Sequence, residues 1–305
     1  MSRGRWLTVN EQIEHCKNKG ITFTGYSEEM AKRYLSTHNT FFRLRSYRKN
    51  FVKNNEGKYI DLDFSHLVDL SIIDYELRRI LLDMTLNIEH YTKINLVNYI
   101  GLRKAGDAYY LIKNFLGMNP DIQKSIESKR RNIYDEDLYA KYGNPNRMPI
   151  WVFVEFITFS ELIRLIKYTA GYFNDKRFGK NANQLFDIKA VRNACAHDIC
   201  ILNDIAHSNR STKVSNLLSA ALGKIGIKES RRKSKLSKIR LSQIASVLFF
   251  HKRIVKSTGV DRQISEQLQY IKDRFFREHT YNKNLSLQST FQFLSDIIDN
   301  WYKIV

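Results

Sequence analysis

Proline is scarce in this chain, and that scarcity constrains the fold more than any other feature. The 305 residues include three prolines, at positions 120, 145 and 149, and none follows residue 149. Proline kinks or ends a helix because it lacks a backbone N–H and its ring clashes with the preceding turn. So few breaks in a long chain favour long helices over a turn-rich β architecture. We therefore predict an all-α protein.

Apolar residues recur at helical spacing along much of the chain. The longest series occupies positions 73, 77, 80, 84, 88 and 91, which marks one apolar stripe on a helix of about 25 residues or more. The other patterns predict helices near residues 27–35, 120–141, 150–167, 183–203, 214–221, 264–275 and 287–301. Because 43% of the residues are hydrophobic, the chain can bury a substantial core. We expect these helices to pack as a bundle.

We divide the chain into three parts. Residues 1–58 form a predicted N-terminal docking segment, residues 59–205 a helical core, and residues 206–305 a basic helical region that is separate or belongs to the same bundle. Within the first part, residues 41–49 combine aromatic and basic side chains. We predict that these aromatic residues are buried against the core. The alternative is that they stack directly on RNA bases.

The chain is strongly basic, with 50 Lys and Arg against 31 Asp and Glu and a net charge of +19. Such an excess favours a polyanionic partner, nucleic acid first and an anionic membrane second. The longest apolar stretch, residues 150–159, contains Glu155 and is shorter than the roughly 20 residues of a membrane span. We therefore predict an RNA-binding protein with no membrane association.

The densest basic segment is 224–240, which holds eight basic residues and one acid. We predict that its cations contact an RNA backbone without reading sequence; a merely solvated basic face is the alternative. The predicted RNA-binding residues are Lys228, Arg231, Arg232, Lys233, Lys235, Lys238 and Arg240.

The three cysteines, Cys16, Cys195 and Cys200, form no motif typical of a zinc site or a disulfide framework. We interpret them as buried core thiols of a protein in the reducing cytoplasm. The first residues, 1–6, lack the apolar segment of a secretory signal. Nucleotide-binding and serine-hydrolase motifs are also absent from the sequence. We expect no metal and no cofactor.

The segment 191–197 has the composition of a catalytic helix. On a helical wheel Asn193 and His197 share a side opposite the apolar stripe, and the long side chain of Arg192 can reach the same groove. Histidine can transfer the protons of phosphodiester cleavage, and a guanidinium can stabilise the negative phosphorane. Asn193 can orient the imidazole or bind a phosphate oxygen. The alternative is an ordinary solvated polar face.

Small residues surround His197. Ala190, Ala194 and Ala196 lie toward its side of the helix, and small side chains let another backbone approach closely. A symmetric second copy presenting the same face would bring two Arg192 and His197 pairs together. We predict a homodimer or a higher oligomer.

Several sequence motifs occur in this chain in the same order as in a known protein family. Residues 192–197 resemble the R-N-x-x-x-H signature of HEPN domains, and the wider chain, from about 10 to 205, is similar to Abi-like proteins of bacterial abortive infection of the AbiD/AbiF type. Supporting blocks are residues 41–47, 74–78 with Glu89, and 148–160, together with Asn203. The chain departs from the family at 198–202, where many relatives carry a second His, an Arg and a Trp.

The resemblance implies a HEPN-like helical bundle and a metal-independent endoribonuclease that acts as a phage-defence effector or toxin. It further implies cleavage by 2′-hydroxyl attack with Arg192 and His197, an active groove across a dimer, and a small noncoding RNA as a possible regulatory partner. The alternative function is a noncatalytic module that holds a structured small RNA on its basic surface.

Overall fold

The computed structural model describes residues 6–103, 108–144, 147–207 and 215–304, which form two compact units. The first unit comprises residues 1–84, 191–252 and 256–305, and the second comprises residues 85–190 and 253–255. Within the described residues the only β structure is two isolated bridges, Thr22 to Asp63 and Lys53 to Tyr59. The predicted all-α class is confirmed. The division at residues 58 and 205 and the HEPN-like bundle stay predictions.

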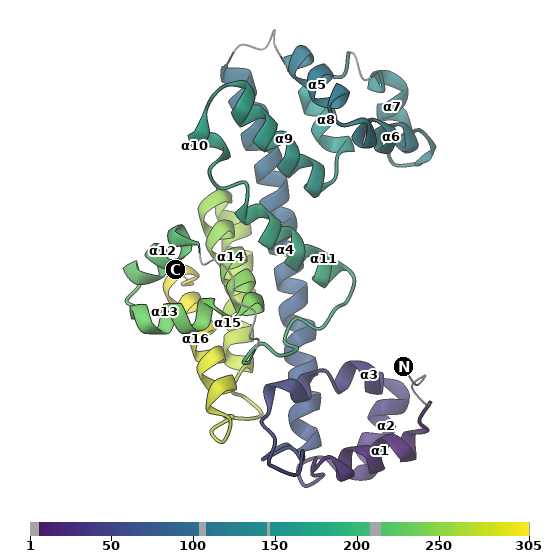
Figure 1. Ribbon diagram of the computed structural model, residues 1–305, viewed down its shortest axis with the longest axis vertical. Helices are drawn as coiled ribbons and strands as arrows, with labels where there is room; N and C mark the ends of the chain where they lie inside the picture. The colour runs from purple at the N-terminus through teal and green to yellow at the C-terminus, as the bar shows by residue number, and fades with distance from the viewer. Residues whose placement is uncertain (1–5, 104–107, 145–146, 208–214, 305) are drawn as a thin grey trace. The chain divides into compact units, whose positions relative to one another are not determined.

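The longest element is α4, a helix of 39 residues from Phe64 to Leu102 that belongs to both units (Figure 1). Its predicted apolar stripe is confirmed, because Ile73, Met84 and Ile88 are fully buried. Asp63 begins the helix by accepting a hydrogen bond from the Ser65 N–H. Burial opposes ionisation of Asp63, but hydrogen bonds from Ser65 and from two upstream threonines outweigh it and lower its pKa to about 2.

Short helices precede α4 in the first unit. They are α1 (Val9–Asn18), α2 (Glu28–Thr37), α3 (Phe41–Leu44) and the 3₁₀ turn η1 (Tyr47–Asn50). Ser27 caps α2 by accepting the Met30 N–H, a position that serine favours. Thr40 caps α3 in the same way through the Arg43 N–H. These caps fix where the aromatic and basic segment 41–49 begins.

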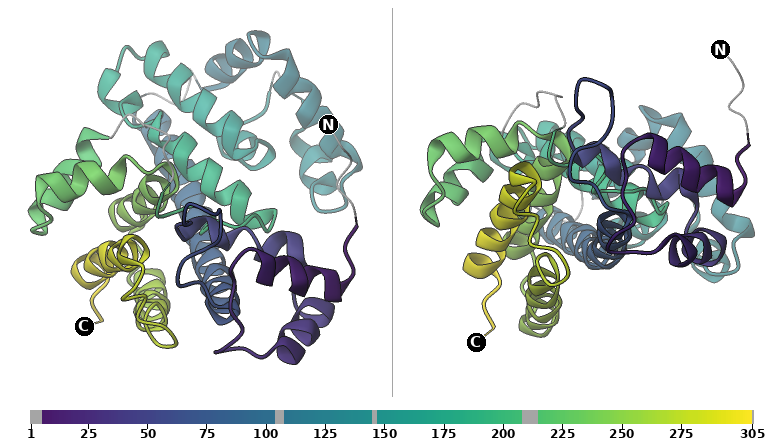
Figure 2. Two further views of the ribbon diagram at one scale, coloured as in Figure 1. Left: turned by 60° about the horizontal axis from the view of Figure 1, so that its bottom comes forward. Right: turned by 90° about the horizontal axis from the view of Figure 1, so that it is seen from below.

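The C-terminal helices pack in the first unit. They are α12 (Asn216–Lys224), α13 (Glu229–Leu236), α14 (Ile239–Ile254), α15 (Thr258–Arg274) and α16 (Leu285–Trp301). Figures 1 and 2 show α15 and α16, in yellow-green and yellow, side by side, and the Phe275 and Phe291 rings stack at 4.7 Å. Asp69 of α4 pairs with Arg274 and accepts the Tyr281 hydroxyl, all three buried. The end of α15 and the segment that follows it therefore share a core with the first half of α4.

The second unit shows two differences from the predicted helices. Its further helices are α5 (Ala108–Gly117), α6 (Pro120–Ser128), η3 (Lys129–Arg131), α7 (Glu136–Tyr142), α8 (Ile150–Phe156), α9 (Phe159–Tyr172) and α10 (Lys176–Gly179). The single helix predicted for 120–141 is thus three pieces. The one predicted for 150–167 is broken, because Thr158 and Glu161 form a capping box that starts α9 anew.

The apolar helix α14 was missed by the sequence analysis. Most of its residues from Leu241 to His251 are buried. Its sequence therefore has no polar face that alternates with an apolar stripe, and helical spacing could not be recognised in it. None of the helices within the described residues has the length and apolar character that a bilayer crossing requires.

Acid should weaken the fold through His251 of α14. Burial, reinforced by Lys252, lowers the His251 pKa from 6.5 to about 4, so the unfolded chain takes up this proton at a higher pH than the folded chain. Stability should fall as pH drops from about 6.5 to about 4, by up to about 3 kcal/mol. Urea unfolding of the parent and of His251→Gln at several pH values measures this. The variant should lose most of that slope.

His90→Gln is the matched control because His90 is exposed on α4. It should unfold with the pH dependence of the parent protein. Identical slopes for His251→Gln and the parent would contradict the assignment.

Candidate functional site

Helix α11 (Gln184–Ala196) ends immediately before His197. Asp198 takes the left-handed conformation with φ of 57°, its N–H donates to Cys195 O at 3.2 Å, and the Ile199 N–H donates to Ala194 O at 2.8 Å. This pair of bonds is the Schellman ending of a helix, with Asp where Gly is usual. The prediction of a helix through residue 203 is therefore wrong beyond 196. Cys200 and the residues after it form an irregular segment.

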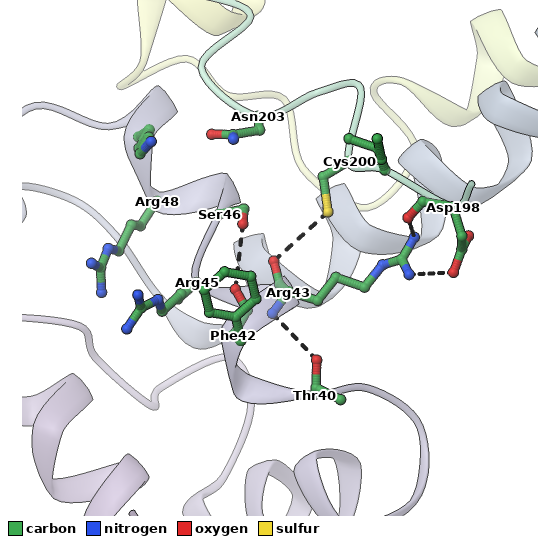
Figure 3. Close-up of a pocket in the computed structure, with 11 residues that line it drawn as sticks. Thr40, Phe42, Arg43, Arg45, Ser46, Arg48, Asp198, Cys200 and Asn203 are labelled. Atoms are coloured by element: carbon green, nitrogen blue, oxygen red, sulfur yellow. Dashed lines mark hydrogen bonds and ion pairs between the residues drawn. The ribbon is translucent and has the colours of Figure 1, made fainter. Parts of the chain in front are cut away.

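Two arginines hold Asp198 in this conformation. Arg43 of α3 donates to the carboxylate and to the backbone oxygen of Asp198 (Figure 3). Arg78 of α4 donates to the other carboxylate oxygen. A left-handed residue other than glycine costs about 1–2 kcal/mol, and charge-assisted hydrogen bonds of this kind offset it. The turn after His197 is thus fixed from α3 and from α4.

Asp74 extends this network into the core. It is fully buried and accepts Arg78 Nε and the Leu202 N–H, each at 2.7 Å. Burial raises the pKa of Asp74, and the bonds from Leu202 and Arg78 oppose that rise. Asn50 secures the same segment, since its amide donates to Leu202 O at 2.8 Å and its Oδ1 accepts the Ala206 N–H. Residues 198–206 are therefore held in place although they are not helical.

The three predicted catalytic residues lie at the end of α11. His197 is exposed, and its N–H continues the helical pattern to Asn193 O at 3.0 Å, so the two residues share one side. Arg192 is half-buried and donates from Nη1 to Asn193 Oδ1 at 3.3 Å. Its Nε is buried and has no hydrogen-bond partner within the described ranges. The structure thus joins Arg192 to Asn193 and leaves the His197 ring open to solvent.

The cysteines are buried and unpaired, as the core-thiol interpretation requires. Burial raises the pKa of Cys195 to about 12, so its thiol stays protonated at neutral pH. Cys200 Sγ lies 3.9 Å from Arg43 O as a weak donor. In the described part of the chain no group of three or more His, Cys, Asp or Glu side chains is arranged to hold a metal ion.

Much of the basic segment 224–240 is engaged within the protein. Arg231 pairs with Asp296 of α16, and Arg232 donates to Ile227 O and to the Ser219 hydroxyl. Lys235 donates to Ser289 at 2.6 Å, and burial, with Arg231 and Lys238 nearby, lowers its pKa to about 8. The other predicted contacts lie at the surface or half-buried: Lys228, Lys233, which pairs with Glu229, Lys238 and Arg240. RNA contact by this segment stays a prediction.

A pocket of about 520 Å³ opens beside the fixed turn (Figure 3). Its walls come from α3 and η1 on one side and from the segment 198–203 on the other. We call it the basic pocket; it is lined by Thr40, Phe42, Arg43, Arg45, Ser46, Arg48, Lys49, Asp198, Ile199, Cys200 and Asn203.

Phe42 lines this pocket and is exposed. The prediction that the aromatic residues of 41–49 are buried is therefore wrong at Phe42. Its side chain is 73% exposed, whereas Leu44 and Tyr47 are buried. Leu44 and Tyr47 are three residues apart and face the core together. Phe42 lies on the other side of α3, which the spacing of these residues could have indicated.

Loss of Arg78 should destabilise the protein strongly. Arg78→Met would leave the buried Asp74 without its ionic partner, which typically costs about 3–5 kcal/mol. Arg79→Met is the control, because Arg79 is exposed, lies over the ring of Tyr75 and donates a hydrogen bond to the exposed Tyr75 hydroxyl at 3.3 Å; its cost should stay below about 1 kcal/mol. Urea unfolding measures both. Equal losses for the two variants would disprove a special role for the Asp74 to Asp198 network.

A model of the Abi-like protein family matches residues 33–203, more than half of the chain. Comparisons with curated proteins and with solved structures found no match. The matched range includes Arg43, Asp74 and Arg78, and the end of α11 with Asp198, which are the parts joined by the network described above. The chain belongs to the Abi-like protein family.

Proposed function

We propose that this protein is a metal-independent HEPN endoribonuclease that acts as an effector or toxin in abortive infection, the defence that membership of the Abi-like family suggests. The observation that supports this most is the end of α11. There the solvent-exposed His197 lies one helical turn after Asn193, which is half-buried together with Arg192, and a charged network fixes the turn that follows His197. A reacting group held on a rigid element is what positional catalysis needs.

The proposed reaction is an internal transfer at one phosphodiester. His197 accepts the proton of a 2′-hydroxyl, the 2′-oxygen attacks phosphorus, and the bond from phosphorus to the 5′-oxygen breaks. The leaving 5′-oxygen takes a proton from an imidazolium. The products are a 2′,3′-cyclic phosphate and a 5′-hydroxyl, so no water is consumed.

Arg192 and Asn193 have distinct roles in this proposal. The guanidinium of Arg192 stays charged and stabilises the negative phosphorane. Asn193 accepts a hydrogen bond from Arg192, so it orients the guanidinium and keeps its own amide donors for a phosphate oxygen. The buried Nε of Arg192, which has no acceptor among the described residues, is a donor that a bound phosphate oxygen can meet.

A second copy of the chain would complete the groove. Ala194 and Ala196 leave the His197 side of α11 with little cover, since one is half-buried and the other exposed. A symmetric partner packed there would supply a second His197, so that one imidazole acts as base and the other as acid. A small RNA bound to the same protein would regulate access to this groove.

Replacement of His197 should abolish catalysis without unfolding the protein. We expect His197→Ala to lower RNA cleavage by at least about 10²- to 10⁴-fold and to relieve growth inhibition, because the proton acceptor is lost. His90→Ala, another exposed histidine, is the control. Gel assays of labelled RNA, with detection of the cyclic phosphate end, measure the effect. Equal cleavage by His197→Ala and the parent would refute the proposal.

Chelation should leave cleavage unchanged. The proposed proton transfers use imidazole and the charge stabilisation uses guanidinium, so neither step needs a divalent cation. Cleavage by the parent protein should therefore proceed at the same rate before and after treatment with excess EDTA. A large loss that added Mg²⁺ or Mn²⁺ restores would show that a metal takes part.

A further inference from the structure

Cations without a carboxylate partner line the basic pocket. Arg43 is neutralised by Asp198, but Arg45, Arg48 and Lys49 form no ion pair or hydrogen bond with a side chain of the described residues. Figure 3 shows the Arg45 and Arg48 side chains extending in the same direction. Like charges placed together without counterions destabilise one another. A bound anion would remove that repulsion.

The positive charge of these side chains also affects the pKa of His15, which lies nearby. The pKa of His15 lies below its usual value, first because the ring is partly buried and next because Arg48, Lys19 and Arg45 lie nearby. The cations thus act together on one region. This is the electrostatic setting that concentrates phosphates.

An exposed aromatic ring stands at the edge of this region. Phe42 is 73% exposed, and the Arg45 guanidinium lies 5.0 Å from its ring centroid. An exposed phenyl ring does not contribute the free energy that burial of its apolar surface would give to folding. Aromatic rings beside cations are typical of sites for unpaired bases, because every base has a face that can stack.

The opposite wall supplies polar groups from the segment 198–203, which follows His197 in the chain. Asn203 Oδ1 is buried and unpartnered within the described chain, so it can accept a hydrogen bond from a base or a sugar hydroxyl. Asp198, which follows His197 directly, belongs to the same wall. A pocket of about 520 Å³ also falls in the usual range for ligands of nucleotide size.

We propose that the basic pocket binds one nucleotide of single-stranded RNA beside His197, with its phosphate held by Arg45, Arg48 and Lys49 and its base stacked on Phe42. This inference deepens the proposed function and rests on it for the cleavage next to the pocket. Binding itself does not depend on cleavage. In this arrangement Asn203 accepts a hydrogen bond from the same nucleotide. Arg43 keeps its ion pair with Asp198 and does not bind the phosphate.

A second pocket indicates where the strand continues. Thr40, Phe42 and Arg45 also line a neighbouring pocket of about 740 Å³, whose wall includes Trp6. Trp6 is 87% exposed. A strand that crosses Phe42 would therefore meet a further aromatic surface, away from His197.

Binding should be measured in a background that cannot cut. The probe is a fluorescein-labelled oligouridylate of about twelve nucleotides, titrated by anisotropy onto His197→Ala protein at several salt concentrations. Arg45→Glu with Arg48→Glu should weaken binding at least about 30-fold and lower the slope of log affinity against log salt by about 1.4. Phe42→Ala should weaken it about tenfold, with little change in salt slope. Duplex RNA of the same length should compete poorly.

Lys113→Glu with Lys124→Glu is the matched control. Both lysines are exposed on α5 and α6, and the charge change is the same. This pair should retain nearly all of the affinity. Circular dichroism checks the fold of every variant, and Arg48→Gln replaces the double variant if that one does not fold.

The outcomes separate this inference from the proposed function. Equal affinity of the Arg45 and Arg48 variant and the lysine control would overturn the phosphate site, as would no binding by the parent. An unchanged affinity of Phe42→Ala would overturn the stacking contact. If the pocket variants lose affinity while the protein with His197 never cuts RNA, the inference stands and the nuclease proposal fails.

Discussion

The carboxylate of Asp198, held between Arg43 and Arg78, is the interaction on which the site depends. It lets a residue other than glycine take the left-handed conformation that ends α11, and so it determines where His197 stands. Arg78 is itself fixed by the buried Asp74. The same carboxylate therefore links the core of α4 to the exposed end of α11. Without it the turn after His197, which forms one wall of the basic pocket, would lose the bonds that fix it to α3 and α4.

The fold could be predicted where local pattern and packing agree. The stripe of α4 repeats over enough turns that no other structure could bury it, and Ser27 caps α2 as its residue type suggests. The break between α8 and α9 was predictable in principle from Thr158 and Glu161. The end of α11 was not, because Asp198 forms a C-terminal turn only through arginines far away in sequence. Asp198 meets these arginines only in the folded chain, so its local sequence does not reveal them.

The candidate site was predictable to a similar extent. Arg192, Asn193 and His197 do lie together at one helix end, and Asn193 accepts a hydrogen bond from Arg192 that spacing alone could not predict. Phe42 was assigned to the core because aromatic residues are usually buried. Its exposure follows from the short α3, where Leu44 fills the inward position, and from η1, where Tyr47 does the same.

The basic side chains fall into two groups: those that bond to a carboxylate, carbonyl or hydroxyl of the protein, and those that have no such partner within the described residues. Arg231, Arg232 and Lys235 of the densest basic segment bond within the protein, and so do Arg43 and Arg78. A cation that already has a carboxylate or carbonyl gains less from a phosphate than one surrounded by water and like charge. Arg45, Arg48 and Lys49 line one pocket and have no carboxylate or carbonyl partner of their side chains within the described residues. The charge that is available to bind an anion is therefore better judged from the partners of each cation than from the density of cations along the sequence, and by this measure the basic pocket is the stronger candidate.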